Sequence, residues 1–121
     1  MTEMKELVVE KDLDPEHTLT IDPGLFDILL RNLLKNAVRY APNGSTIRIE
    51  TAKGEMRFIN MGEATDFQRE KIFDRFRKGR GQKSLGLGLS IVKKICEASD
   101  LDIEYDYHEG YHSFIIRKKL P

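Results

Sequence analysis

Residues 29–42 read LLRNLLKNAVRYAP and are the most informative stretch of this 121-residue sequence. Apolar residues recur at every fourth position along one face: Leu25, Leu29, Leu33, Ala37 and Ala41. That spacing predicts an amphipathic helix of about 18 residues. Asp22-Pro23 supplies a helix-start signal, an N-cap acid followed by proline at the first helical position, and turn residues 42–45 end the helix.

Two asparagines, Asn32 and Asn36, lie four positions apart in this helix and therefore on one face of it. A buried amide must find a partner or cost about 1–3 kcal/mol. In one interpretation both amides bond neighbouring backbone groups. In the other they form a cation site, because Mg²⁺ binds few protein oxygens and completes its shell with water and phosphate. Arg39 would then supply charge to the phosphates and Tyr40 a flat face to a base.

Residues 84–95, SLGLGLSIVKKI, form the second informative stretch. Glycine allows a backbone to approach an anion closely, and the first turn of a helix offers N–H groups without internal partners. We expect Gly86 and Gly88 to lie in a loop that leads directly into a helix marked by Leu87 and Ile91. The stretch is neither a Walker A loop nor a Rossmann fingerprint. Together with the asparagine helix, it suggests a phosphate and a metal ion held between two helix faces.

A basic segment precedes the glycines and has two open interpretations. Five cations lie within nine positions of one another: Arg75, Arg77, Lys78, Arg80 and Lys83. The segment is either a solvated surface loop or a lid that closes positive charge over a polyphosphate.

The composition is that of one ordinary globular domain. Twenty basic and twenty acidic residues cancel, which gives no support for binding to nucleic acid or to an acidic surface. No apolar run approaches the roughly 18 residues of a membrane span, and no signal peptide is evident. The single cysteine, Cys96, fits a reducing compartment and a small buried hydrophobic position.

The remaining pattern predicts the element order β-β-α-β-β-α-α-β-β. We expect a short helix within residues 67–76, turns at 53–54 and 109–110, and strands over 5–11, 18–21, 46–51, 55–60, 101–107 and 111–118. This order favours an α+β fold, a two-layer sandwich in which about three helices cover one face of a mixed β-sheet.

In this order the motifs resemble the ATP-binding catalytic (HATPase_c) domain of sensor histidine kinases, in the gyrase/Hsp90/histidine-kinase/MutL superfamily with its Bergerat fold. Residues 32–40 resemble the N box, residues 72–76 (IFDRF) the F box and residues 86–92 (GLGLSIV) the G2 box. The F box points to histidine kinases rather than to their ATPase cousins. The resemblance spans nearly the whole chain and implies one domain, residues 1–121.

Carried over by position, the resemblance implies a site for ATP and Mg²⁺. Asn36 would be the magnesium ligand and Asn32 a polar neighbour near the phosphates. Arg39 would contact phosphate, Tyr40 would lie beside the adenine, and Lys78 would reach the terminal phosphates. Four residues would line the phosphates with backbone N–H groups: Gly86, Leu87, Gly88 and Leu89.

The base-binding motif departs from the family pattern. Where the G1 box reads Asp-x-Gly-x-Gly, this chain has Asn60, Gly62 and Ala64, and Ser84 stands at the first G2 glycine. Asn60 and Gly62 are still assigned to the nucleotide site, because the Asn60 amide oxygen can accept from the adenine amino group. These departures support an alternative, a degenerate kinase-like domain with weak or no nucleotide binding that acts as a regulatory interaction module. An anti-sigma-type serine kinase fits the F box less well.

The implied reaction is transfer of the ATP γ-phosphoryl to a histidine in a separate dimerisation and phosphoacceptor domain. No residue of this chain is expected to be the acceptor, because His17, His108 and His112 lack a helical His-Glu/Asp context and are predicted on the surface. The expected partners are the dimerisation/phosphoacceptor domain of the parent kinase and a response regulator, without nucleic acid or membrane contact. The expected location is cytoplasmic, and the sequence leaves open whether the parent protein is membrane-anchored.

Overall fold

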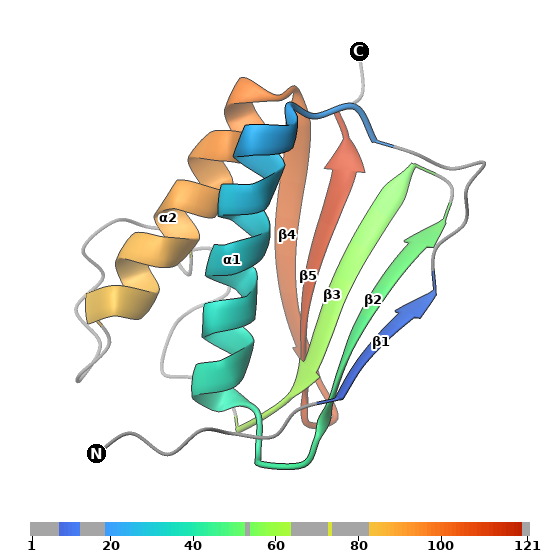
Figure 1. Cartoon of the computed structure of the whole chain (residues 1–121), viewed down its shortest axis with the longest axis vertical. Helices are drawn as coiled ribbons and strands as arrows, with labels where there is room; N and C mark the ends of the chain where they lie inside the picture. The colour runs from blue at the N-terminus through green and yellow to red at the C-terminus, as the bar shows by residue number, and fades with distance from the viewer. Residues whose placement is uncertain (1–7, 13–18, 53, 64–72, 74–82, 120–121) are drawn as a thin grey trace.

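The computed structural model describes residues 8–12, 19–52, 54–63, 73 and 83–119, and these form two layers (Figure 1). Two helices, α1 (Pro23–Tyr40) and α2 (Lys83–Ala98), lie side by side on one face of a sheet. The strands of the described sheet are β1 (Val8–Asp12), β2 (Thr46–Ala52), β3 (Glu55–Met61), β4 (Leu101–His108) and β5 (Tyr111–Lys118). Neither described helix has the length and hydrophobicity that crossing a bilayer requires.

The sheet is mixed, as the sequence predicts. Its strand order is β1-β2-β3-β5-β4, with β1 parallel to β2 and every other neighbouring pair antiparallel. Two tight turns require left-handed backbone: Gly54 joins β2 to β3 with φ 74°, and Glu109 and Gly110 join β4 to β5 with φ 48° and 87°. The predicted turns are therefore confirmed at both hairpins.

Helix α1 begins and ends where its local chemistry dictates. The Asp22 carboxylate accepts hydrogen bonds from the N–H groups of Gly24 at 2.9 Å and Leu25 at 3.1 Å, and Pro23 occupies the first turn. At the other end the Ala41 N–H donates to the Ala37 carbonyl at 2.7 Å before the chain becomes extended. The predicted helix of about 18 residues is confirmed at 18 residues.

Two predicted elements differ in the structure. Helix α2 begins at Lys83, so the prediction that Gly86 and Gly88 lie in a loop is wrong. No strand forms at residues 19–21, where Leu19 and Ile21 instead pack, partly buried, against the core. The predicted short helix at 67–76 lies outside the described residues, apart from Phe73, as do residues 5–7 of the first predicted strand.

The core lies between the helices and the sheet. Its main members come from both layers: Leu29, Leu33, Leu89, Val92, Phe58, Tyr105, Phe114 and Ile116. Cys96 is 1% exposed within this cluster. Burial, together with nearby Asp102 and Glu97, raises the pKa of its thiol to about 12. The cysteine is therefore a packed, unreactive side chain, as expected from its helical position.

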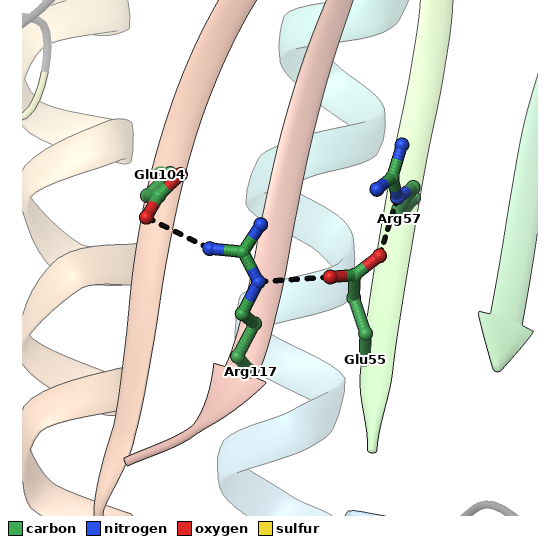
Figure 2. A network of polar contacts seen from close by, with 4 residues as sticks. All are labelled: Glu55, Arg57, Glu104 and Arg117. Atoms are coloured by element: carbon green, nitrogen blue, oxygen red, sulfur yellow. Dashed lines mark hydrogen bonds and ion pairs between the residues drawn. The ribbon is translucent and has the colours of Figure 1, made fainter. Parts of the chain in front are cut away.

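The face of the sheet away from the helices carries a network of four charged side chains (Figure 2). Arg117 on β5 lies between two carboxylates, with Nε 2.8 Å from Glu55 on β3 and Nη1 2.8 Å from Glu104 on β4. Arg57 pairs with the second oxygen of Glu55. The hydrogen bond from Arg117 is the main reason that the pKa of Glu55 lies below its usual value, with Arg57 adding to it against a burial effect of opposite sign. The network links three strands.

We expect the free energy of unfolding to be about 1 kcal/mol lower in Glu55→Gln than in the native protein at pH 7, because the Glu55 carboxylate pairs with two arginines. A depressed pKa in the folded state means that this stabilisation is present above the unfolded pKa and is lost as pH falls through the folded pKa. In urea unfolding, the difference in the free energy of unfolding between the two proteins should therefore be largest at pH 7 and should disappear below about pH 4. Glu50→Gln, which removes a partner of Arg48 only, is the control with a smaller effect. A gap that persists unchanged at pH 3 contradicts this assignment.

Candidate functional site

The two sequence motifs meet at one end of the sandwich. Helix α1 runs toward this end and α2 runs away from it, while β3 finishes there (Figure 1). The C-terminal half of α1, the N-terminal half of α2 and the last residues of β3 are therefore neighbours. All described residues that the sequence analysis assigned to the site belong to these three segments or directly follow them.

Asn32 and Gly88 bring the two helices into close contact. A Cβ added at Gly88 would lie 3.1 Å from Oδ1 of Asn32. The other end of this amide is fixed, because Nδ2 donates to the Ile28 carbonyl one turn earlier at 2.8 Å. The interpretation in which the amide bonds neighbouring backbone is thus correct for the Asn32 nitrogen. Its oxygen faces α2, so the two motif helices are in contact here, and the phosphate and metal ion expected between them stay a prediction.

Asn36 presents a buried oxygen that has no partner in the described part of the chain. The residue is 8% exposed, and its Oδ1 makes no hydrogen bond with any residue that the structure describes. An unpaired buried amide oxygen costs about 1–3 kcal/mol, so the position is unfavourable for the ligand-free fold. A hard cation would satisfy this oxygen, and the donor chemistry fits Mg²⁺. The described residues hold no cluster of three His, Cys, Asp or Glu, so a cation here would need phosphate and water oxygens as its further ligands.

The glycine motif lies inside α2 rather than before it. In an α-helix each N–H donates to the carbonyl four residues earlier, so N–H groups from Leu87 onward point along a helix that begins at Lys83. The N–H groups without internal partners are those of the first turn, and the positive end of the helix dipole lies there. Within α2, Gly88 allows close approach to Asn32, while Leu89 is buried in the core at 1% exposure.

Asn60 occupies a buried position next to the end of β3. It is 3% exposed, and its Nδ2 donates to the Met61 carbonyl at 3.1 Å. In the sheet register its partners are Ile47 on β2 and His112 on β5. The bond to Met61 engages the donor end of the amide, which leaves the oxygen as the group that can accept from a base.

The two residues that follow β3 are held by side chains of the β4–β5 hairpin. The carbonyl of Gly62 accepts from the Tyr107 hydroxyl at 2.9 Å, and its N–H donates to the Gly110 carbonyl at 3.0 Å. The carbonyl of Glu63 lies 2.8 Å from Nε2 of His112. The chain therefore leaves the sheet in a direction fixed by hydrogen bonds.

For the other predicted site residues the structure gives fewer contacts. Arg39 is exposed in the last turn of α1, and Tyr40 is the final residue of that helix. Lys78 lies outside the described residues. From the F-box segment the structure describes Phe73, which is 8% exposed and meets Phe114 edge-on at 6.1 Å between ring centroids. Phe73 thus packs against β5 of the sheet.

Sequence reasoning missed the role of His112. The prediction of a surface residue is wrong, because His112 is 2% exposed, whereas His108 lies on the surface with 77% of its side chain exposed. His17 lies outside the described residues. A signal was present in β5, where His112 alternates with the apolar Phe114 and Ile116 and so shares their inward face. Its contact with Glu63, 49 positions away, has no local signature.

Comparison with known proteins gives consistent matches along most of the chain. The family described as histidine kinase-, DNA gyrase B- and HSP90-like ATPases matches residues 21–121. The sensor protein QseC of Escherichia coli strain K12 is 36% identical over 89 residues, covering 71% of this chain and 20% of that protein. The sensor histidine kinase HprS of the same strain is 34% identical over 102 residues, covering 78% of this chain and 23% of that protein. The chain thus spans about a fifth of the length of these relatives.

Solved structures share the fold. The catalytic domain of the histidine kinase ThkA, in a nucleotide-free form, superposes with a TM-score of 0.73 at 27% identity, covering 93% of this chain and 78% of that one. The cytoplasmic segment of the histidine kinase QseC gives a TM-score of 0.68 at 24% identity, covering 95% and 59%. The predicted α+β sandwich of the Bergerat type is confirmed.

Proposed function

This chain belongs to the family of histidine kinase-, DNA gyrase B- and HSP90-like ATPases, and we propose that it is the ATP-binding catalytic domain of a sensor histidine kinase. The observation that carries the proposal is the buried Oδ1 of Asn36, which has no hydrogen-bond partner among the described residues. A fold that keeps an unpaired amide oxygen in the helix of the N-box motif gains from a ligand that binds it. Mg²⁺ carried by a nucleotide triphosphate is such a ligand.

In this proposal the site has a phosphate half and a base half. In the phosphate half, Asn36 would bind Mg²⁺, Asn32 would lie near the phosphates and Arg39 would add positive charge. The first turn of α2, which includes Gly86, would face the phosphates through its unpaired N–H groups and the positive end of the helix dipole. Leu87, Gly88 and Leu89 follow inside the helix, where their N–H groups are engaged, so they would lie near the phosphates without lining them. Lys78 completes this half in the proposal, as the cation that reaches the terminal phosphates.

In the base half, Asn60 would accept from the adenine amino group through Oδ1, since Nδ2 already donates to the Met61 carbonyl at 3.1 Å. Gly62, fixed by its two hydrogen bonds to the β4–β5 hairpin, would form the floor of this half. Tyr40, at the end of α1, would stack beside the base.

The proposed reaction moves the γ-phosphoryl of ATP to a histidine of another domain. The bond between the γ-phosphorus and the bridging oxygen breaks, ADP leaves with those electrons, a nitrogen–phosphorus bond forms, and the imidazole proton is released. Bound Mg²⁺ would neutralise the phosphate charge. The two described histidines support an acceptor outside this chain: His112 is buried with both ring nitrogens engaged, and His108 is the last residue of strand β4.

The proposed partners follow from a reaction whose acceptor histidine belongs to another domain. We propose that residues 1–121 form one catalytic domain that acts on the dimerisation and phosphoacceptor domain of a longer parent kinase. A response regulator would then take the phosphoryl group from that domain in a cytoplasmic phosphorelay. The identity to sensor proteins of which this chain covers about a fifth supports this arrangement.

Reconstituted phosphotransfer tests the proposed reaction. The chain is mixed with the separately produced phosphoacceptor domain of its parent protein, γ-labelled ATP and Mg²⁺. We expect label on the acceptor that is stable in alkali and lost in acid, and no label when the acceptor histidine is replaced. Label on a serine of a partner would instead identify a serine kinase of the same superfamily.

The alternative function is a degenerate regulatory module, and the altered base half favours it. Asn60 lacks the charge of the family's aspartate, and Ala64 stands where the family has glycine. The two functions differ in the effect of Asn60→Asp. If the native site works, excess ATP or ADP with Mg²⁺ raises the Tm of the native chain, and the variant adds a further shift of a few degrees at most. A shift in the variant alone identifies the native chain as a degenerate module.

A further inference from the structure

We propose that His112 is a positioning residue, which holds the end of β3 and the two residues after it, Gly62 and Glu63, in the orientation that binds the base. The inference rests on the proposed function as an ATP-binding domain. It assigns to β5 a part in the site that neither motif helix supplies.

The first step is the placement of His112 within the sheet. In the register it lies opposite Asn60 on β3 and opposite Tyr107 on β4. Its side chain is on the helix-covered face and is 2% exposed. The centroids of the Tyr107 and His112 rings are 4.7 Å apart, and those of Tyr105 and His112 are 5.8 Å apart. His112 is thus enclosed between the base half of the site and two tyrosines.

The second step is the direction of its hydrogen bonds. A carbonyl oxygen only accepts, so Nε2 carries the hydrogen and donates to Glu63 at 2.8 Å. Nδ1 of the neutral ring then accepts from the Tyr105 hydroxyl at 2.6 Å. Burial lowers the pKa of His112, with the bond to the Glu63 carbonyl acting in the opposite direction. The neutral tautomer that these bonds require is therefore the favoured form.

The third step is what the bonds hold. His112 fixes the Glu63 carbonyl while Tyr107 fixes the Gly62 carbonyl at 2.9 Å. Both attachments come from the β4–β5 hairpin and act on the two residues directly after β3. Asn60 lies at the penultimate position of that strand. An apolar side chain at position 112 could fill the same space, but it would release Glu63 and leave the Tyr105 hydroxyl without this acceptor.

The effect should therefore fall on the base half alone. Mg²⁺-ATP binds through both halves, whereas inorganic tripolyphosphate with Mg²⁺ contacts the phosphate half only. Calorimetric titration of both probes measures each half separately. In the native chain we expect tighter binding of ATP than of tripolyphosphate.

In His112→Leu we expect ATP affinity to fall by about tenfold and tripolyphosphate affinity to change less than about twofold. His112→Gln should restore most of the ATP affinity, because its amide nitrogen can donate where Nε2 does. Tyr107→Phe removes the hydroxyl that holds Gly62 and keeps the packing, so it tests the neighbouring attachment of the same two residues if His112→Leu does not fold, with an expected loss of about threefold for ATP alone. Ile95→Val, a mild change in the core on helix α2 rather than on β5, is the stability control.

Equal loss of both probes in His112→Leu shows that His112 has a packing role and overturns the inference. Equal loss in Tyr107→Phe overturns it as well, because the attachment of the two residues after β3 to the β4–β5 hairpin would then not act on the base half. Unchanged ATP affinity in those variants overturns it as well. A native chain that binds neither probe refutes the proposed function, and the positioning role with it. If the native chain binds ATP and the His112 and Tyr107 variants change ATP affinity no more than Ile95→Val does, the positioning role alone is refuted.

Discussion

Replacing Asn36 with leucine is expected to stabilise the ligand-free protein and to abolish Mg²⁺-dependent ATP binding. Oδ1 of Asn36 is buried and unpaired, so an apolar side chain of similar size removes its desolvation cost. The free energy of unfolding should rise by about 1–3 kcal/mol, with a Tm higher by several degrees. The same change removes the proposed magnesium ligand. Opposite effects on stability and binding are typical of a functional site that the fold maintains at a cost.

Thermal unfolding without ligand and calorimetric titration with Mg²⁺-ATP measure the two effects. Asn32→Leu is the matched control one turn earlier, because Asn32 makes a hydrogen bond to Ile28 that its replacement loses. It should not stabilise the protein. Asn36→Asp keeps an oxygen ligand while it adds charge beside the phosphates, so binding should survive as turnover falls. If Asn36→Leu lowers stability, the oxygen has a structural partner and the magnesium assignment is wrong.

Gly88→Val should have the second large effect, because it separates the two motif helices. The new Cβ would lie 3.1 Å from Oδ1 of Asn32, and that amide cannot turn away without losing its bond to Ile28. We expect a loss of about 1–3 kcal/mol in stability, together with weaker Mg²⁺-ATP binding. In Gly88→Ala the gain in helix propensity, about 1 kcal/mol, offsets the close contact, so the net change should be small.

A double-mutant cycle gives the decisive control for Gly88. Asn32→Ser shortens the opposing side chain, so Gly88→Val should cost less stability in the Asn32→Ser background than in the native one. The coupling energy should exceed about 0.5 kcal/mol, as for other residues in contact. Strictly additive costs would mean that Gly88 and Asn32 do not restrict each other, and the close contact would then not explain the glycine.

Local signals in the sequence were sufficient for most of the fold. Asp22-Pro23 predicted the start of α1, and alternation predicted β2, β3, β4 and β5 to within about one residue at each end. The start of α2 was misplaced because glycine normally weakens a helix. Here the packing of Gly88 against Asn32 requires a residue without a side chain inside the helix. The strand predicted at residues 18–21 is absent at Leu19 and Ile21, because the alternation of these residues reflects burial against the core rather than strand pairing.

The site could be predicted only in part. The spacing of Asn32 and Asn36 predicted that both lie on one face of a helix, and helix α1 of the structure contains both, four residues apart. The unpaired state of the Asn36 oxygen needed coordinates, because it depends on what surrounds a buried atom. The same holds for His112, whose partner Glu63 is 49 positions away. Long-range hydrogen bonds of this kind leave no periodic pattern in a sequence.

Calorimetric titration of the native chain with ATP, in the presence and absence of Mg²⁺, tests the central proposal most directly. We predict saturable binding to one site that requires Mg²⁺ and that disappears in Asn36→Leu while the variant remains folded. Absence of binding heat from the native chain at millimolar Mg²⁺-ATP, or equal binding by Asn36→Leu, would contradict the proposal.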